Sequence, residues 1–302
     1  MKIMITGGSG FIGSNLLSFF SENYPNYEII SFGRKAPPKG DYNFVEGDIL
    51  HIKDLRKALH GVDYVFHLAA ESHVDVNERS KFDFIKSNVL GTQILLEASL
   101  ANNIKKIIYL SSSEVYGDKS DGLFKETDPI NPKNLYGASK AASEIFAEYY
   151  YKFHDLPIVI VRACNIFGEN QKPDKIISKF INNLLQNKKI PIYGEGKSLR
   201  SYLYVKDLCN ALVLLLEKGE PGEIYNIGSK DELSALDLAR MILNKLGKNE
   251  TYIEFAEARD LDRERAVLDI SKIEKLGWRQ KTNFEEALDK TISWYKRKNP
   301  ND

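Results

Sequence analysis

The chain has 302 residues, 43% of them hydrophobic, and its 42 Lys and Arg residues equal its 42 Asp and Glu residues in number. The hydrophobic fraction is sufficient for a core and argues against disorder, and the balanced charge provides no basic surplus for binding nucleic acid. The chain has only two cysteines, so we expect no disulfide framework, and its five histidines lack metal-ligand spacing, so we expect no metal site. No apolar run approaches the roughly 20 residues of a membrane span, so we expect no membrane partner. Because no secretion signal opens the sequence, we expect a cytoplasmic protein with a small-molecule ligand.

Hydrophobic runs and helical periodicity alternate through the first half of the chain. Nearly unbroken hydrophobic strands separated by helices are typical of a parallel sheet covered on both faces. We therefore expect an α/β fold with a doubly wound parallel sheet, a Rossmann domain, over residues 1–168. The predicted strands are residues 2–6, 28–32, 43–46, 64–67, 106–110 and 157–161.

The pattern changes after Gly168. The predicted elements that follow are a helix at 173–186, a short strand at 190–193, and helices at 234–246 and 283–296. This order predicts a smaller C-terminal α/β lobe within residues 169–302, from which the chain crosses back to the sheet.

A glycine-rich loop, GGSGFIG at residues 7–13, joins the first predicted strand to the first helix. In that context Gly7 and Gly10 leave room for the backbone to approach a pyrophosphate, and Gly13 lets the helix pack closely on the sheet. The N–H groups at the start of the helix, around Phe11 and Ile12, then face the phosphates. A tight turn alone also needs glycines, but the position between strand and helix favours dinucleotide binding by residues 1–168.

The second predicted strand ends without the acidic residue that commonly holds the adenosine ribose. Arg34 stands near that place in the segment SFGRK. A guanidinium there pairs with a ribose phosphate and favours NADP, or it is a solvated charge of the loop, and both interpretations stay open. Asp48 and Ile49 follow the third strand, where they are placed to contact adenine, although an Asp at a strand end also serves turns.

Tyr136 and Lys140 are four residues apart in the segment YGASK, so a helix places both on one face. A tyrosine with a pKa of about 10 is a poor base at neutral pH. A neighbouring ammonium group and a nicotinamide cation stabilise its phenolate, however, so we expect Tyr136 to act as a base beside Lys140. In isolation the pair would equally suit a solvated helix face.

Serines and a glutamate follow the strand at 106–110, at the edge where ligands meet an open parallel sheet. Ser112 is placed to hydrogen-bond an alcohol as it becomes a carbonyl, and Glu114 supplies a carboxylate near the same atoms. Serines at strand ends also cap turns, so a structural role is the alternative for Ser112 and Ser113.

These motifs together resemble the extended short-chain dehydrogenases/reductases that act on nucleotide sugars, the NAD-dependent epimerase/dehydratase family. The resemblance spans nearly the whole chain and includes HLAA at 67–70, NVLGT at 88–92 and SEVYG at 113–117. It implies NAD as the cofactor and a homodimer in which the helices at 80–101 and 136–154 pair across a twofold axis. It adds four residues to the cofactor site, Leu68, Ala69, Ala70 and Asn88.

Within that family, AESHVD at 70–75, RACNIFG at 162–168, YGEG at 193–196 and RSYLYV at 200–205 are most similar to dTDP-glucose 4,6-dehydratases. The resemblance implies that the C-terminal lobe binds a nucleotide-diphosphate sugar, with Arg200 and Arg265 as phosphate partners. The residues implied in substrate binding are Ser72, His73, Asn165, Lys175, Tyr193, Arg200 and Arg265.

The implied reaction begins when Tyr136 takes the proton of the sugar 4-hydroxyl while C4 gives up a hydride. Glu114 then removes the C5 proton, and water leaves from C6 with help from Ser113 or a bound water. The dehydratase pattern has an Asp, a much stronger acid, where this chain has Ser113, although GDP-mannose dehydratases and nucleotide-sugar decarboxylases also have Ser there. A 4-epimerase, a UDP-glucuronate decarboxylase and a cofactor-sensing binding protein therefore stay open as alternatives.

Overall fold

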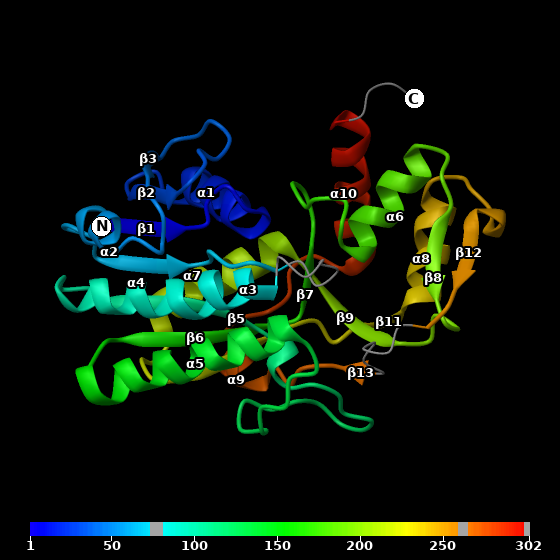
Figure 1. The fold of residues 1–302 in the computed structure, drawn as a ribbon. Coiled ribbons are helices and arrows are strands. Elements are labelled where there is room, and N and C mark those ends of the chain that lie inside the picture. The colour runs from blue at the N-terminus through cyan, green and yellow to red at the C-terminus, as the bar shows by residue number, and fades with distance from the viewer. Residues whose placement is uncertain (73–80, 259–264, 299–302) are drawn as a thin grey trace.

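The computed structural model describes residues 1–72, 81–258 and 265–298, and its centre is a seven-stranded sheet (Figure 1). Every neighbouring pair of strands in this sheet is parallel, which confirms the expected doubly wound α/β fold. From one edge to the other the strands are β3 (Asn43–Glu46), β2 (Glu28–Gly33), β1 (Lys2–Thr6), β4 (Tyr64–His67), β5 (Lys106–Ser112), β6 (Ile158–Ala163) and β10 (Ile224–Ile227).

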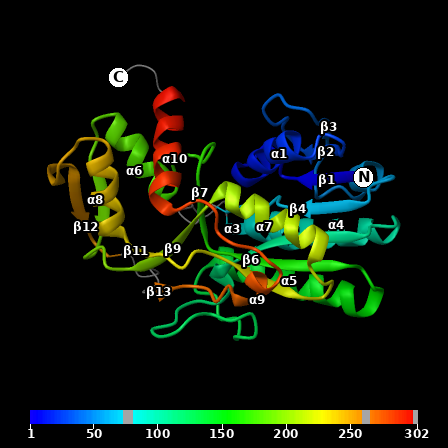
Figure 2. The same cartoon turned by 180° about the vertical axis from the view of Figure 1, so that it is seen from behind.

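Helices cover both faces of this sheet. One face carries α1 (Phe11–Asn23) and α7 (Val205–Lys218), which lie in front in Figure 2, and the other carries α2 (Ile52–Ala58), α4 (Gly91–Leu100) and α5 (Leu135–His154). Side chains alternate along each strand, so Ile3 and Ile5 join the hydrophobic core under α1 and α7 while Met4 joins the core on the opposite face. Two buried faces explain why the strand sequences are almost continuously hydrophobic.

A second, smaller group of elements lies beside the carboxyl ends of the large sheet (Figure 1). Its hydrophobic core is separate from the two cores of the large sheet. Its strands are β7 (Asn165–Phe167), β8 (Ile190–Tyr193), β9 (Leu199–Tyr204), β11 (Glu232–Ser234), β12 (Ile253–Ala256) and β13 (Arg265–Ala266). Its helices are α6 (Ile176–Leu185), α8 (Ala235–Lys245) and α10 (Phe284–Lys298), while α9 (Ser271–Lys275) packs against β10.

The chain passes between the two groups more than once. β7 precedes residue 168 yet pairs with β9 of the smaller group, and α7 and β10 return to complete the large sheet. The boundary at residue 168 therefore stays a prediction. Within the described ranges, no helix combines the length and hydrophobicity that crossing a membrane requires.

Several elements differ at their ends from the sequence-based expectation. The helical stretch expected at 80–101 consists of α3 (Lys81–Phe84), a π-helical turn (Ile85–Leu90) and α4. β5 runs two residues further than expected, because Ser111 and Ser112 pair with Arg162 and Ala163 of β6. A 3-10 turn (Ser113–Val115) follows directly, so the serines mark the end of the strand and Glu114 the turn after it.

Candidate active site

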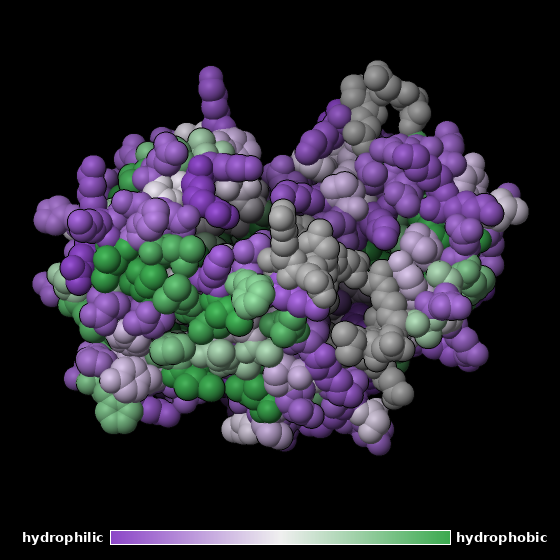
Figure 3. Space-filling model, viewed as in Figure 1, coloured by the Kyte–Doolittle hydropathy of each residue, from purple (hydrophilic) through white to green (hydrophobic). Residues whose placement is uncertain are grey.

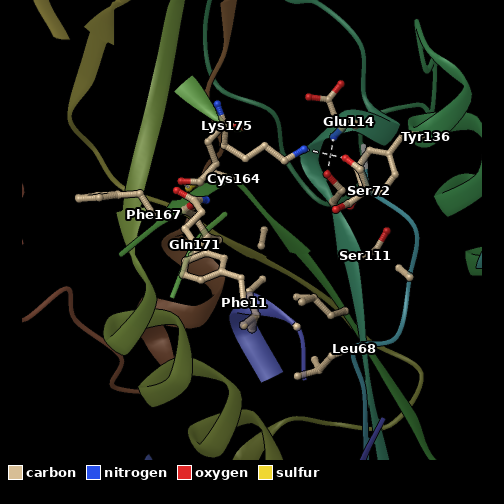
Figure 4. A pocket seen from close by; sticks show the side chains of 18 of the residues that line it. Phe11, Leu68, Ser72, Ser111, Glu114, Tyr136, Cys164, Phe167, Gln171 and Lys175 are labelled. Atoms are coloured by element: carbon tan, nitrogen blue, oxygen red, sulfur yellow. Dashed lines mark hydrogen bonds between the residues drawn. The ribbon is translucent and has the colours of Figure 1, made fainter. Parts of the chain in front are cut away.

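A cavity of about 360 Å³ lies where the carboxyl ends of β1, β4, β5 and β6 meet the smaller lobe (Figure 4). We call it the central cavity. Its position at the strand ends is where open parallel sheets bind ligands. It is lined by Gly7, Gly10, Phe11, Ile12, Gly13, Leu68, Ala70, Ser72, Leu110, Ser111, Ser112, Glu114, Tyr136, Lys140, Ala163, Cys164, Asn165, Ile166, Phe167, Gln171, Lys175, Ile176, Ile177 and Tyr202.

The glycine-rich loop forms one wall of the central cavity with no room for side chains. A Cβ atom on Gly7, whose φ is +75°, would lie 2.8 Å from the backbone nitrogen of Ala69, and one on Gly13 would lie 2.2 Å from the Gly7 carbonyl oxygen. Gly10 precedes α1, and no side chain caps the first turn of this helix. The helix N-terminus therefore presents backbone N–H groups and a positive dipole end to the cavity, an arrangement that suits a diphosphate. The loop thus fits the pyrophosphate of a dinucleotide.

The loop after β4 meets this glycine loop at the point where the strand order reverses, between β1 and β4. The Thr6 hydroxyl oxygen accepts hydrogen bonds from the backbone N–H groups of Leu68 and Ala69, both at 3.2 Å. Leu68 and Ala70 line the central cavity, whereas Ala69 packs against Gly7. Dinucleotides bind at such a switch point in open α/β sheets.

Asn88 lies outside the cavity lining and is fully buried. Its amide donates to the Glu71 carbonyl at 3.0 Å and to the Ser139 hydroxyl at 2.8 Å, and its Oδ1 accepts from the Glu71 N–H at 2.7 Å. These hydrogen bonds occupy both polar atoms of the Asn88 side chain. An effect of Asn88 on a cofactor is therefore indirect, through the loop after β4 and through α5.

The three residues expected at the adenosine end also lie outside the cavity lining. Arg34 is exposed just after β2. The Asp48 Oδ1 accepts from the Leu50 N–H at 3.0 Å, the turn interaction that the sequence left as the alternative, and Ile49 packs against Gly91 of α4.

Tyr136 and Lys140 occupy the first turns of α5 and both line the central cavity. Lys140 is only 2% exposed, and its Nζ lies 4.4 Å from the centroid of the Tyr109 ring. This ammonium group makes no hydrogen bond or ion pair with the described residues, and its close partner is the face of the Tyr109 ring. Its N–H donors are therefore available to a ligand.

Burial shifts the pKa of both residues away from the values of exposed groups. Burial lowers the pKa of Lys140 to about 7, against the opposing charge of Glu144. Burial raises the pKa of Tyr136 to about 12, although a hydrogen bond with Ser112 acts in the lowering direction. The phenol is thus protonated at neutral pH in the protein alone, since burial and the charge of Glu114 raise the pKa more than the Ser112 hydrogen bond lowers it.

The end of β5 carries further polar groups of the central cavity. Ser112 and Glu114 line it, and the Ser112 Oγ accepts from the Glu114 N–H at 3.2 Å (Figure 4). The Glu114 Oε2 accepts from the Asn134 amide at 2.8 Å. Ser113 is 3% exposed and lies outside the lining, so the structure does not place its hydroxyl in the cavity wall.

A buried ion pair lies beneath these residues. The Arg162 guanidinium of β6 donates to both carboxylate oxygens of Glu144, the closest contact being 2.7 Å, and the Ser111 hydroxyl donates to the same carboxylate. Glu144 is four residues beyond Lys140 on α5. This pair ties the helix that carries Tyr136 and Lys140 to β5 and β6.

Three of the seven residues expected to bind substrate line the central cavity, namely Ser72, Asn165 and Lys175. The Lys175 Nζ donates to the Ser72 carbonyl oxygen at 2.7 Å, which links the smaller lobe to the loop after β4 (Figure 4). His73 lies outside the described residues.

Tyr193, Arg200 and Arg265 belong to the smaller lobe but not to the cavity lining. Arg265 makes a two-pronged ion pair with Glu232, at 2.6 and 2.9 Å, and also donates to the Gly122 carbonyl. Its guanidinium is thus largely committed to protein partners, the packing role that the sequence left as the alternative. Arg200 lies on β9, adjacent to β13, and donates to the Leu199 carbonyl at 2.9 Å.

Sequence reasoning missed several residues of the site. Gln171, Phe167 and Cys164 line the central cavity, and their signal was their position in and after the motif RACNIFG. Asn134 was also missed, although an Asn two residues before Tyr136 matches the preference of helix N-caps. Among the described residues, no group of three or more His, Cys, Asp or Glu side chains is arranged to hold a metal ion.

Comparison with known proteins places this site in a family. Among curated relatives, a dTDP-D-glucose 4,6-dehydratase of Bos taurus is 37% identical over 314 residues, covering 98% of this chain and 88% of the relative. A low-salt glycan biosynthesis protein of Haloferax volcanii is 38% identical, covering 98% of both chains. Both alignments extend over the large sheet and the smaller lobe.

Solved structures of known proteins are also similar to this chain over nearly its full length. A dTDP-glucose 4,6-dehydratase from Streptomyces venezuelae, solved with NAD bound, has a TM-score of 0.93 at 34% identity, covering 99% of this chain and 98% of that one. A UDP-glucuronic acid 4-epimerase from Bacillus cereus, in complex with UDP-glucuronic acid and NAD, has a TM-score of 0.91 at 30% identity, covering 98% and 99%. A family model matches residues 3–228. The chain belongs to the NAD dependent epimerase/dehydratase family.

Proposed function

We propose that the chain is a cytoplasmic, NAD-dependent nucleotide-sugar 4,6-dehydratase that acts on dTDP-glucose or a close analogue. The observation that carries the proposal is the presence of Tyr136, Lys140 and the Glu114 carboxylate in the wall of one cavity. With NAD as the hydride acceptor, a tyrosine and a lysine suffice to oxidise an alcohol, whereas elimination also needs a base for the carbon next to the new carbonyl. The relatives at 36–37% identity that are named dTDP-D-glucose 4,6-dehydratases support the same choice.

The residues present fit NAD. The glycine loop accommodates a diphosphate, and the buried Lys140 ammonium and the Tyr136 phenol stand together beyond it in the same cavity. When bound, NAD would supply the hydride acceptor for oxidation at C4 and the hydride donor for reduction at C6. Its positive charge also acts on Tyr136, whose pKa burial raises to about 12 in the protein alone, in the direction that favours the phenolate.

Residues of α5 and of the end of β5 carry out the first half of the proposed reaction, the oxidation at C4. Tyr136 accepts the proton of the sugar 4-hydroxyl, and the Ser112 hydroxyl holds the same oxygen. Lys140, which contacts the face of the Tyr109 ring, has N–H donors available for the cofactor ribose and the phenolate. A 4-keto sugar results.

The second half belongs to Glu114. The new carbonyl acidifies C5, and the Glu114 carboxylate takes that proton. Ser113 does not reach the cavity wall, so we assign the proton required by the departing C6 hydroxyl to the newly protonated Glu114. Two protons are released in the cycle, from the 4-hydroxyl and from C5. Two are consumed, by the departing hydroxyl and by C5 of the product.

Incubation with dTDP-glucose, UDP-glucose and GDP-mannose, followed by mass analysis, tests this function. We expect loss of one water from the preferred substrate. Glu114→Gln keeps the size of the side chain and one oxygen able to accept from Asn134 but removes the charge and the basic carboxylate, and we expect it to oxidise C4 while losing dehydration by at least 100-fold. Normal dehydration by this variant would show that another group removes the C5 proton.

A 4-epimerase is the second candidate, because Ser113 replaces the acid of the dehydratase pattern and a 4-epimerase is among the structural neighbours. The same incubation separates the two functions, since an epimerase changes retention but not mass. An inverted sugar of unchanged mass would exclude the dehydratase.

We further propose that the chain forms a homodimer through α3, α4 and α5. Large hydrophobic side chains are exposed on these helices, and Figure 3 shows hydrophobic residues gathered over α4 and α5. The most exposed on these helices and on the π-helical turn between α3 and α4 are Phe82, Ile85, Leu135, Ile145 and Phe153. An apolar face of this extent on helices that already cover the sheet favours a self-complementary partner. Ile145→Glu, at a side chain 66% exposed, should yield a folded monomer by light scattering; an unchanged dimer would place the interface elsewhere.

A further inference from the structure

Asn134 contacts two different parts of the site with the two ends of one side chain. Its Oδ1 accepts from the Gly137 N–H at 2.8 Å, which caps the N-terminus of α5. Its Nδ2 donates to the Glu114 Oε2 at 2.8 Å. The capped helix carries Tyr136 two residues later, so one amide group connects both of the proposed proton-transferring residues.

The backbone around this amide is closely packed. A Cβ atom on Gly137 would lie 2.5 Å from the Glu114 carbonyl oxygen, so the 3-10 turn that carries Glu114 lies directly against the first turn of α5. Backbone packing thus sets the distance between the turn and the helix. The Glu114 side chain has further torsions of its own, and the Asn134 amide restrains where its carboxylate points.

We infer that Asn134 is a positioning residue that directs the Glu114 carboxylate toward the C5 proton of the substrate. This inference rests on the proposed dehydratase function. Helix capping alone does not require an amide, because Asp and Ser are equally good N-caps. Asp offers no donor and Ser offers one hydroxyl on a shorter side chain, whereas Asn carries the accepting oxygen of the cap and a separate N–H donor for a neighbouring carboxylate.

Two substitutions separate the cap from the donor. Asn134→Asp keeps a capping oxygen but loses the donor and places a second negative charge beside Glu114, and Asn134→Ser keeps a shorter cap without adding charge. We expect both variants to unfold within a few degrees of the wild type. Dehydration should fall roughly 10-fold in Asn134→Ser and about 100-fold or more in Asn134→Asp, the range for losing a hydrogen bond to a charged group.

The loss should appear in kcat for dehydration with the KM for the nucleotide sugar nearly unchanged, while oxidation at C4 is retained. Asn249 caps a 3-10 turn on the smaller lobe through the Thr251 N–H, at 3.1 Å, and is not part of the central cavity. Asn249→Ser is therefore the matched control and should leave kcat unchanged.

If Asn134 serves only as a helix cap, a different result is expected. Asn134→Asp would then be as active as the wild type, or its rates of C4 oxidation and of dehydration would fall together with its unfolding temperature. Either result overturns the inference. A crystal structure of Asn134→Ser adds a readout that does not depend on the reaction. We expect the Glu114 carboxylate in more than one orientation, and a single unchanged orientation would contradict the role. Failure of the wild type to dehydrate any nucleotide sugar would instead remove the proposed function itself.

Discussion

Lys140 is expected to reduce the stability of the folded protein while it serves the reaction, and replacing it by methionine tests this. Burial lowers the pKa of this amine from 10.5 to about 7. Each pKa unit corresponds to about 1.4 kcal/mol, so a shift of about 3.5 units gives a cost of up to about 5 kcal/mol for charging the folded protein. Methionine has a similar length and no charge. We therefore expect Lys140→Met to stabilise the unliganded protein by about 3 to 5 kcal/mol at low pH and to abolish activity.

The sign of the pH dependence follows from proton binding. Below pH 7 the amine is charged in both the folded and the unfolded chain, so the cost is fully present. Between pH 7 and 10.5 the unfolded chain binds the proton and the folded chain does not, so wild-type stability rises with pH relative to the variant. Above this window the difference disappears, because the amine is neutral in both states.

Thermal unfolding of the unliganded proteins at pH 6, 8 and 10, followed by circular dichroism, measures the effect. At about 2 °C per kcal/mol the variant should unfold roughly 6 to 10 °C higher than the wild type at pH 6, and the gap should narrow by pH 10. Lys152→Met is the control, because Lys152 lies exposed on the same helix and makes a surface ion pair with Glu148 at 2.9 Å. A variant that is no more stable at pH 6, or a gain that does not change with pH, would refute the reasoning.

Two further predictions concern the groups around Lys140. Tyr109→Phe should keep kcat/KM within about twofold of the wild type, because the ring face is retained. Tyr109→Leu should lower kcat/KM roughly 10-fold, because it removes the cation–π contact with Lys140. Equal activity of the two variants would exclude a role for the ring. Arg162→Met leaves the Glu144 carboxylate buried without its guanidinium partner and should lower the free energy of unfolding in urea by about 3 to 5 kcal/mol. Arg162→Met combined with Glu144→Gln should recover part of that loss, and a double variant as unstable as the single one would assign the loss to packing.

Much of the fold was predictable because its strands are buried on both faces. The six expected strands occur in the large sheet, since hydrophobic runs of four to seven residues separated by helices leave few other arrangements. The seventh strand, β10, was not predicted as a strand. It has only four residues, includes the polar Asn226, and follows a long excursion of the chain through the smaller lobe.

The site was predictable where its residues lie close together in the sequence. The glycine loop, Ser112, Glu114, Tyr136 and Lys140 were all expected, and all line the central cavity. Sequence spacing does not predict contacts between residues that are far apart in the chain. The ion pair of Arg265 with Glu232, 33 residues away, follows from strand pairing in the smaller lobe. Asn88 shows the same, because its bonds to Glu71 and Ser139 depend on how the helix at 81–100 docks beside α5.

The path of one hydrogen atom tests the central claim most directly. dTDP-glucose deuterated at C4 should yield a product that has lost one water and carries the deuterium at C6, because the hydride leaves C4 and returns to C6 within one active site. Deuterium that remains at C4, or is lost to free cofactor, would contradict the proposed reaction.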